Sequence, residues 1–207
     1  MPDADILRIP HHAQRRVRWK NDAGWTTEIL ARPAGDDFDW RLSVAEFAAD
    51  CDFSPYPGVD RTILALTGAG FDLHVADDPP VHLAPGGEPY AFSGDRPARA
   101  SVSGPTRDFN VMTRRARVAH ALTTHTLAGR RPLARPAHTT TAVYVVDGLA
   151  HLHGEPIRPG ECVLVEPDPR DRPPLHLEGA AALVIVELTP AGAARSPLRL
   201  PPHRRHN

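Results

Sequence analysis

Turn signals that recur at short intervals constrain the fold of this chain more than any other sequence feature. Beyond residue 70, clusters of Pro, Gly, Asp and Ser stand at 77–80, 85–87, 93–95 and 103–105. The runs between them are short and β-prone, and residues 71–75 alternate apolar with polar side chains. Turns about every 8–12 residues between short alternating runs are typical of an all-β sandwich or barrel. The 23 prolines of the 207-residue chain fit this fold class, because they are scattered between the runs.

The stretch from Trp40 to Gly68 is predicted to form two strands joined by a rigid turn. Its first part has the alternation of a half-buried strand, with Trp40, Leu42 and Val44 on one face and Arg41, Ser43 and Ala45 on the other. Asp, Ser, Pro and Gly residues break the pattern within 52–58, and a second apolar run follows at 63–66. This hairpin would hold Arg61, at the start of its second strand, over an apolar interior.

A further strand with two different faces is predicted at residues 108–115. Strand alternation places Phe109 and Val111 on one face and Asp108, Asn110 and Met112 on the other. Residues 116–135 are rich in Ala, Thr and Arg, and we expect a connecting strand or linker there. The last strand is expected at 181–189.

A weak internal repeat divides the chain into two halves. Residues 62–75 and 82–92 correspond to 142–154 and 156–167: in each half a strand ends at Gly, an alternating strand follows, and a Pro-Gly turn leads into another strand. This pattern resembles the cupin fold, a small double-stranded jelly roll. We therefore predict two cupin-like barrels, at 1–118 and 119–190, followed by a mobile tail at 191–207 that has too little apolar content for a core.

Composition excludes several classes of partner. Twenty-five acidic and 24 basic residues give a net charge of −1, which provides no electrostatic footprint for nucleic acid. The N-terminus lacks a signal peptide, and the longest apolar run, at 180–186, is far too short to span a bilayer. Cys51 and Cys162 are read as reduced core residues of a cytoplasmic protein. The oligomeric state stays open, with a homodimer as one alternative.

The first half resembles the HutD/Ves family of bicupin proteins. The resemblance lies in WKNDAGWTTEI (19–29), in the segment 38–68 around WRLSVAEF and GVDRTILALTG, and in YAFSGDRPARASVSGPTRDFNVMTRR (90–115). One departure is that Asp22 and Ala23 stand where the family motif usually has glycines after Trp-Lys-Asn. The resemblance implies a role linked to histidine utilisation and the binding of a small carboxylate metabolite, with no established reaction for the family as a whole.

Arg61 is the first candidate for that ligand site. Its guanidinium can clamp a carboxylate by two parallel, charge-assisted hydrogen bonds. The alternative is an ion pair that locks the turn, with Asp60, Asp52 or Asp39 as partner. Around Arg61 we expect further site residues: Lys20, Asn21, Asp108 and Asn110 as polar groups, with Arg41, Trp40 and Phe109 as walls. Lys20 is the only lysine beside 23 arginines, a contrast that either marks a functional ammonium or follows from composition.

No metal ion or other cofactor is predicted. The first half offers only His74 and His82, with no closely spaced pair near Arg61. His151 and His153 follow the Gly148 turn, where we expect both rings on one solvent-exposed face of a strand. His138 and His176 lie nearer the usual cupin ligand positions but lack a carboxylate. Nucleophile-elbow and phosphate-loop motifs are also absent from the sequence.

These observations predict a two-cupin protein that binds a small carboxylate in its first half. By resemblance, the ligands would be intermediates of histidine breakdown, such as urocanate or a formyl- or formimino-glutamate, and the role would be to sense or limit pathway flux. One alternative is a metal-independent isomerase, lyase or hydrolase that acts on a similar acid, with Lys20 as general base. Another is a protein–protein adaptor with a vestigial pocket.

Overall fold

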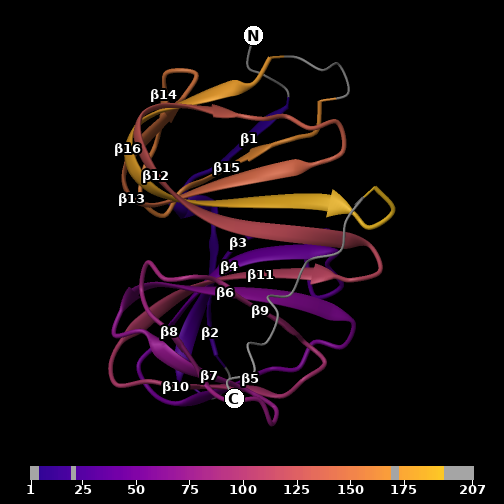
Figure 1. The fold of residues 1–207 in the computed structure, drawn as a ribbon, viewed down its shortest axis with the longest axis vertical. Helices are drawn as coiled ribbons and strands as arrows, with labels where there is room; N and C mark the ends of the chain where they lie inside the picture. Colours follow the sequence, from indigo (N-terminus) through magenta and orange to yellow (C-terminus); the bar gives the residue numbers. More distant parts are fainter. Residues whose placement is uncertain (1–4, 20–21, 169–172, 194–207) are drawn as a thin grey trace, which may run out of the picture.

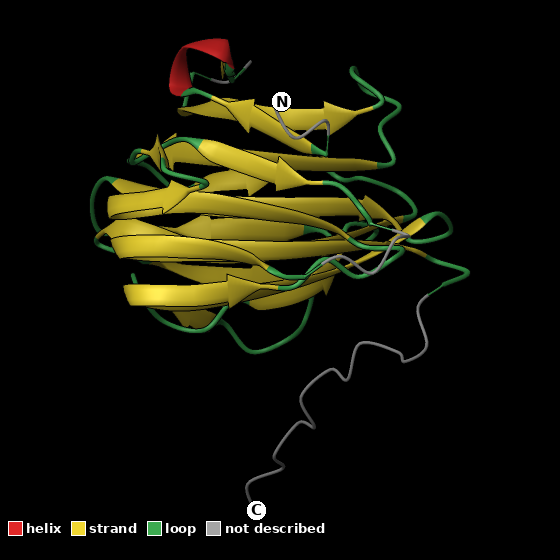
Figure 2. Ribbon diagram, turned by 90° about the horizontal axis from the view of Figure 1, so that it is seen from above, coloured by secondary structure: helices red, strands yellow, loops and turns green. Residues whose placement is uncertain are grey.

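The chain folds into antiparallel β-sheets in the computed structural model, which describes residues 5–19, 22–168 and 173–193. Over these ranges the one helical element is a 3-10 turn, η1 (His11–Ala13), which Figure 2 shows in red at the edge of the stacked strands. None of the described segments forms a helix with the length and apolar character needed to cross a membrane. The predicted all-β class is confirmed.

Three sheets make up the described part of the chain. The central sheet has the order β2 (Arg15–Arg18), β3 (Gly24–Arg32), β4 (Trp40–Phe47), β11 (Thr106–Arg114), β6 (Val59–Gly68) and β9 (Tyr90–Ser93). The small sheet has the order β5 (Cys51–Phe53), β10 (Ala98–Ser101), β7 (Phe71–Val75) and β8 (Val81–Leu83). The C-terminal sheet has the order β1 (Ile6–Ile9), β15 (Cys162–Val165), β13 (Thr140–Leu152), β16 (Leu175–Pro190) and β12 (Val118–Leu133), with β14 (Glu155–Ile157) paired to β13.

The central sheet is covered on both faces. In Figure 1 it lies between the C-terminal sheet above and the small sheet below. Toward the C-terminal sheet it presents an apolar core in which the Phe109 and Tyr144 rings lie 5.1 Å apart. Toward the small sheet, Phe47 meets Phe71 edge-on at 5.5 Å. Because the two faces meet different environments, the alternation along each central strand decides which side chains enter the first-half interior, the space between the central and small sheets.

The predicted hairpin at 40–68 is wrong, because β4 and β6 do not pair with each other. β11 lies between them and pairs antiparallel with both. After β4 the chain leaves the central sheet, contributes β5 to the small sheet, and only then returns as β6. As a result Met112 of β11 lies opposite both Arg41 and Arg61.

The second half also differs in detail from the expected pattern. Of the two alternatives for residues 116–135, a connecting strand or a linker, the structure shows a strand, the 16-residue β12, which pairs along its length with β16. β13 does not end at Gly148 but continues through it, with a left-handed φ of 82° at this glycine. β1 pairs with β15, so the start of the chain joins the C-terminal sheet. Most of the predicted tail, residues 194–207, falls outside the described residues.

His120 joins the C-terminal sheet to the central sheet through two buried hydrogen bonds. Its Nε2 lies 2.7 Å from the Thr62 hydroxyl of β6, and its Nδ1 lies 2.7 Å from the Thr113 hydroxyl of β11. A neutral imidazole serves both contacts, with one nitrogen donating and the other accepting. Burial lowers the pKa of His120 to about 4, because the charged ring would lose its hydration.

We expect His120 to make folding sensitive to mild acid. The unfolded chain takes up a proton at this residue near pH 6.5, whereas the folded chain does so only near pH 4. The stabilising contribution is therefore complete above pH 6.5 and is lost as the pH falls toward 4, by about 3 kcal/mol. Denaturant unfolding between pH 7 and 4 should show a shallower loss of stability in His120→Gln than in the unmodified protein. Equal slopes in the two proteins would contradict this role.

Candidate functional site

Three neighbouring strands place a polar cluster inside the first half. On the faces of β4, β11 and β6 that point to the small sheet, Asp108 and Asn110 of β11 follow each other two residues apart, and Arg41 and Arg61 flank Met112. We call Arg41, Arg61, Asp108 and Asn110 the interior polar cluster. Apolar residues lie on both sides of it along the strands: one group contains Phe47 and Phe71, and another contains Phe38 and Met112.

Arg61 is a buried cation whose guanidinium keeps an unpaired nitrogen among the described residues. The residue is 5% exposed, and its Nε has no hydrogen-bond partner. No ion pair joins it to any described residue: Asp60 pairs with Arg115 and Asp39 with Arg117. Asp52, the third expected partner, is exposed on β5 opposite Arg99. Burial lowers the pKa of Arg61 to about 10, because the guanidinium has lost hydration without gaining a full counter-charge.

Aromatic rings surround the Arg61 guanidinium. Its central carbon lies 5.0 Å from the ring centroid of Phe92, 5.2 Å from that of Phe53 and 5.9 Å from that of Tyr56. The ring faces attract a cation and offset part of its desolvation. The rings leave the N–H groups of the guanidinium available to donate hydrogen bonds to other groups.

Asp108 is the acidic member of the cluster and is fully buried. Neither of its carboxyl oxygens has a hydrogen-bond partner among the described residues. Burial raises the pKa of Asp108 to about 7, although the Arg61 charge and the main-chain N–H of Ala45 favour the ionised form. The carboxyl group therefore changes its charge near neutral pH.

The other two members also keep unpaired polar atoms. Asn110 is buried, and its Oδ1 accepts no hydrogen bond from the described residues. Arg41 donates from Nη2 to the Tyr56 hydroxyl at 3.2 Å and contacts the Met112 sulfur at 3.0 Å, but its Nε is buried and unpaired. Each member of the cluster thus holds at least one buried atom that a ligand could satisfy.

Sequence reasoning missed the aromatic residues of this site. Tyr56 belongs to the Pro-braced turn between β5 and β6, and its ring lies near both arginines, 5.3 Å from Arg41 and 5.9 Å from Arg61. Phe92 lies directly opposite Arg61 on β9. Tyr56 had a local signal in the sequence, because it stands between two prolines just before the strand of Arg61. The pairing of Phe92 with Arg61 had no local signal.

Trp40 and Phe109 do not contribute to the interior polar cluster. Both belong to the core between the central and C-terminal sheets, on the faces opposite Arg41 and Asp108. There the Trp40 ring lies 5.6 Å from the Arg32 guanidinium, and Arg32 pairs with Glu166. We expected these aromatics to form walls of the ligand site. This expectation is wrong, because the two-residue alternation of β4 and β11 places them on the opposite face of the central sheet.

Lys20 and Asn21 lie outside the described residues, so their expected site roles stay predictions. The turn that follows them helps to line a cleft of about 490 Å³ at the other end of the central sheet. Gly68 of β6 also lines this cleft and is seven residues from Arg61, roughly 23 Å along a strand. Asp22, one of the departures from the family motif, has a left-handed φ of 56°, a conformation that glycine adopts easily and Asp tolerates.

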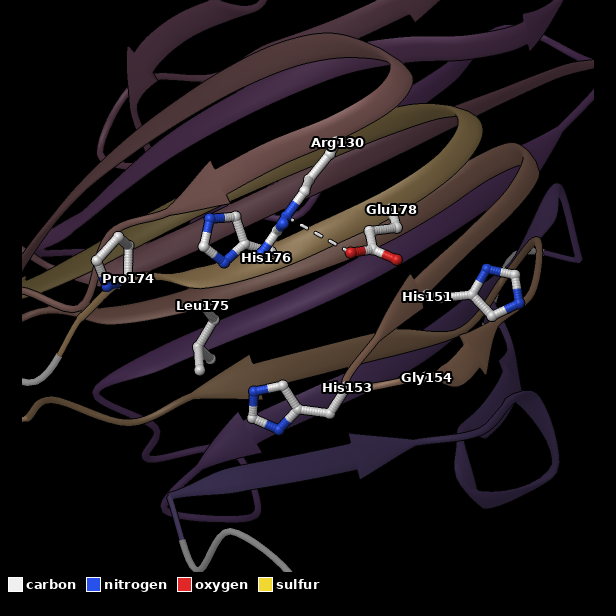
Figure 3. Close-up of a pocket in the computed structure, with 8 residues that line it drawn as sticks. All are labelled: Arg130, His151, His153, Gly154, Pro174, Leu175, His176 and Glu178. Carbon is white, nitrogen blue, oxygen red and sulfur yellow. Dashed lines mark ion pairs between the residues drawn. The ribbon is translucent and has the colours of Figure 1, made fainter.

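A second cleft, of about 180 Å³, lies in the C-terminal sheet. Figure 3 shows its lining residues: Arg130, His151, His153, Gly154, Pro174, Leu175, His176 and Glu178. His151 and His153 do not share one strand face, because His153 follows the end of β13 with a left-handed φ of 55°, and Figure 3 shows the two rings pointing in different directions. In the described parts of the chain, no group of three or more His, Cys, Asp or Glu is arranged to hold a metal ion.

The two cysteines are free and buried, as predicted. Burial raises the pKa of both thiols to about 12, which keeps them neutral. Cys51 lines the first-half interior and Cys162 the core next to the C-terminal sheet. A nucleophilic role for either thiol has no support in this environment.

Comparison with known proteins relates this fold and site to a family. The chain is 38% identical over 115 residues to Protein Ves from Cronobacter sakazakii, a match that covers 55% of this chain and 60% of that relative's length. The solved structure of HutD from Pseudomonas fluorescens SBW25 superposes with a TM-score of 0.76 at 28% identity, over 89% of this chain and 98% of that one. The oxalate decarboxylase of Lactobacillus farciminis, with a TM-score of 0.62 at 9% identity over 88% of this chain and 85% of that one, shares the cupin-like fold alone.

The family assignment rests on most of the chain. The family model described as HutD matches residues 11–184, a range that contains the central sheet, the small sheet and the C-terminal sheet apart from β1 and the end of β16. The predicted resemblance is therefore confirmed by sequence and by fold. This chain belongs to the HutD family.

Proposed function

We propose that the protein binds a small carboxylate metabolite at the interior polar cluster, with Arg61 as the anchor. The observation that carries this proposal is a buried guanidinium that has no ion-paired partner among the described residues. Burying a charge without a counter-charge costs several kcal/mol. A carboxylate ligand would supply that counter-charge and accept two parallel hydrogen bonds from the planar fork.

One similar structure motivates the choice of a small acid as the first ligand to test. The similar HutD structure from Pseudomonas fluorescens is described for a formate condition, and formate is the smallest carboxylate. Among larger acids we propose intermediates of histidine breakdown, such as urocanate or a formyl- or formimino-glutamate, and a role in limiting the flux of that pathway. We further propose that the two halves are two cupin units, that only the first carries the ligand, and that the protein acts in the cytoplasm.

Thermal unfolding with added carboxylates tests this proposal. Formate, acetate, urocanate and N-formylglutamate should each be compared with sodium chloride at equal ionic strength. A ligand that binds only the folded state increases the free energy of unfolding, by about 2.7 kcal/mol at a ligand concentration of one hundred times its Kd, and so raises the melting temperature. At least one acid should raise the melting temperature in a saturable way. If every acid acts like chloride, the proposal is wrong.

A second candidate function is catalysis on the same acid. The observation that favours it is Asp108, a fully buried carboxyl group with a pKa of about 7 beside the proposed anchor. A general acid or base is most effective when its pKa lies near the working pH. Product analysis by mass spectrometry after incubation with the acids that bind would decide: turnover that Asp108→Asn abolishes supports an enzyme, and unchanged acids support a binding protein.

A further inference from the structure

The interior polar cluster contains more than a place for an anion. Three buried acceptor atoms have no donor among the described residues: Oδ1 and Oδ2 of Asp108 and Oδ1 of Asn110. Both residues project from the same face of β11, two positions apart, toward the small sheet. They therefore form one acceptor patch, separate from the donors of Arg61.

A simple carboxylate does not satisfy this patch. A carboxylate ion has only acceptor atoms, so it can meet Arg61 and the Asn110 NH2 group but offers no hydrogen to the ionised Asp108 carboxylate or to Asn110 Oδ1. It also adds negative charge next to an acidic side chain. A buried acceptor left without a donor costs about 1–3 kcal/mol.

Over residues 22–168, which hold the whole cluster, no strong donor takes the place of a ligand. The groups that act electrostatically on Asp108 are the Arg61 guanidinium from β6 and the Ala45 N–H from β4, and neither forms a hydrogen bond of normal geometry with the carboxyl group. Cys51 of β5 also interacts electrostatically with Asp108, but its thiol is neutral and only a weak donor. Arg41, the remaining cation of the cluster, directs its Nη2 to Tyr56 and Met112.

We infer that the ligand carries an N–H group at the end opposite its carboxylate, and that Asp108 and Asn110 accept hydrogen bonds from this group while Arg61 holds the carboxylate. This inference rests on the proposed binding function. The N–H group belongs to the class of primary amides, imidazoles, amidines or ammonium ions. Because the pKa of Asp108 is about 7, its carboxyl group has an acceptor oxygen in either protonation state.

The spacing of the two subsites limits the ligand. Arg61 lies opposite Met112, which is four residues from Asp108, roughly 13 Å along β11. The long Arg61 side chain covers part of this distance and the shorter Asp108 side chain covers less. A carboxylate and an N–H group joined by a short carbon chain fit this spacing better than the adjacent groups of an α-amino acid.

Isothermal calorimetry with matched acids tests the inference. Succinamate and levulinate have the same shape and the same carboxylate but differ in an amide NH2 against a methyl group, and glutaramate and 5-oxohexanoate form a pair one carbon longer. In at least one pair the amide should bind about 10-fold or more tightly than the ketone, because the ketone leaves the acceptors unpaired. In Asp108→Leu, which removes two of the three acceptor atoms but keeps a similar volume, the preference within that pair should fall several-fold, to what Asn110 alone supports. Asp108→Asn keeps a carbonyl acceptor and is the control that should retain part of the preference.

The outcomes separate this inference from the proposed function. If both acids of a pair bind the unmodified protein equally and both are lost in Arg61→Ala, the inference is overturned and the anion site stands. If none of the four acids binds, the inference is also overturned, and the response to formate in thermal unfolding then decides the anion site by itself. A preference for the amide that is undiminished in Asp108→Leu would overturn the role of Asp108. Circular dichroism of each variant confirms that it is folded.

Discussion

The Asp108→Asn replacement is expected to be more stabilising at pH 8 than at pH 4. The change that it causes in the free energy of unfolding should differ between the two pH values by about 4 kcal/mol. The folded chain holds the proton of Asp108 up to about pH 7, whereas the unfolded chain releases it near pH 3.8. As the pH rises from 3.8 through 7, ionisation therefore favours the unfolded state, and the stabilising contribution of the neutral acid is lost. The amide is neutral at every pH, so the variant does not lose this stability.

Denaturant unfolding at several pH values measures this difference. Asp52→Asn is the matched control, because it makes the same chemical change at a carboxylate that is exposed on β5 instead of buried. His120 acts in the opposite direction between pH 4 and 6.5, but it is present in both proteins and cancels in the difference. If Asp108→Asn changes stability equally at pH 4 and pH 8, Asp108 does not hold its proton in the folded protein.

Replacing Arg61 by alanine is expected to weaken carboxylate binding by 10- to 100-fold, about 1.5–3 kcal/mol, with the fold intact. The loss follows because Arg61 provides the charge-assisted hydrogen bonds of the proposed site. Arg61 forms no ion pair with a described residue, so its removal breaks no such pair there and takes away only its electrostatic attraction for Asp108. Stability in the absence of ligand should therefore fall little, since the lost packing is offset by the removal of a poorly compensated charge.

Calorimetry with the acid that gives the largest thermal shift is the measurement. Arg99→Ala is the matched control, because Arg99 is exposed and pairs with Asp50 at the surface, away from the interior. It should bind the acid as the unmodified protein does. A folded Arg61→Ala protein with unchanged affinity would show that the guanidinium is a structural residue caged by Phe53, Tyr56 and Phe92.

Strand positions and strand faces were predictable from the sequence where alternation was strong. The strand at 108–115 was expected with Asp108, Asn110 and Met112 on one face, and β11 has this arrangement. The same rule applied to residues 40–45 already separated Trp40 from Arg41. Grouping both residues in one site went against that alternation, and the structure shows them on opposite faces of the central sheet.

Long-range neighbours were not predictable in the same way. The two strands of the stretch 40–68 were expected to pair because they are close in sequence and joined by a turn. The structure instead inserts β11 between β4 and β6, and the pairing of β6 with β11 joins residues 38 to 55 positions apart. A period of two along one strand says which side chains share a face, but it carries no information about which strand lies next to it.

The sequence by itself determined the all-β class, the HutD family, the position of Arg61 at the start of a strand and the shared face of Asp108 and Asn110. Only the tertiary structure decided that these residues meet, that the local aspartates are engaged elsewhere, and that aromatic rings surround the guanidinium. The reason is that burial and charge pairing depend on strands brought together from distant parts of the chain. Arg61, expected from the sequence at the end of a turn, is in the structure a buried cation that interacts with Asp108, a buried acid with a pKa of about 7.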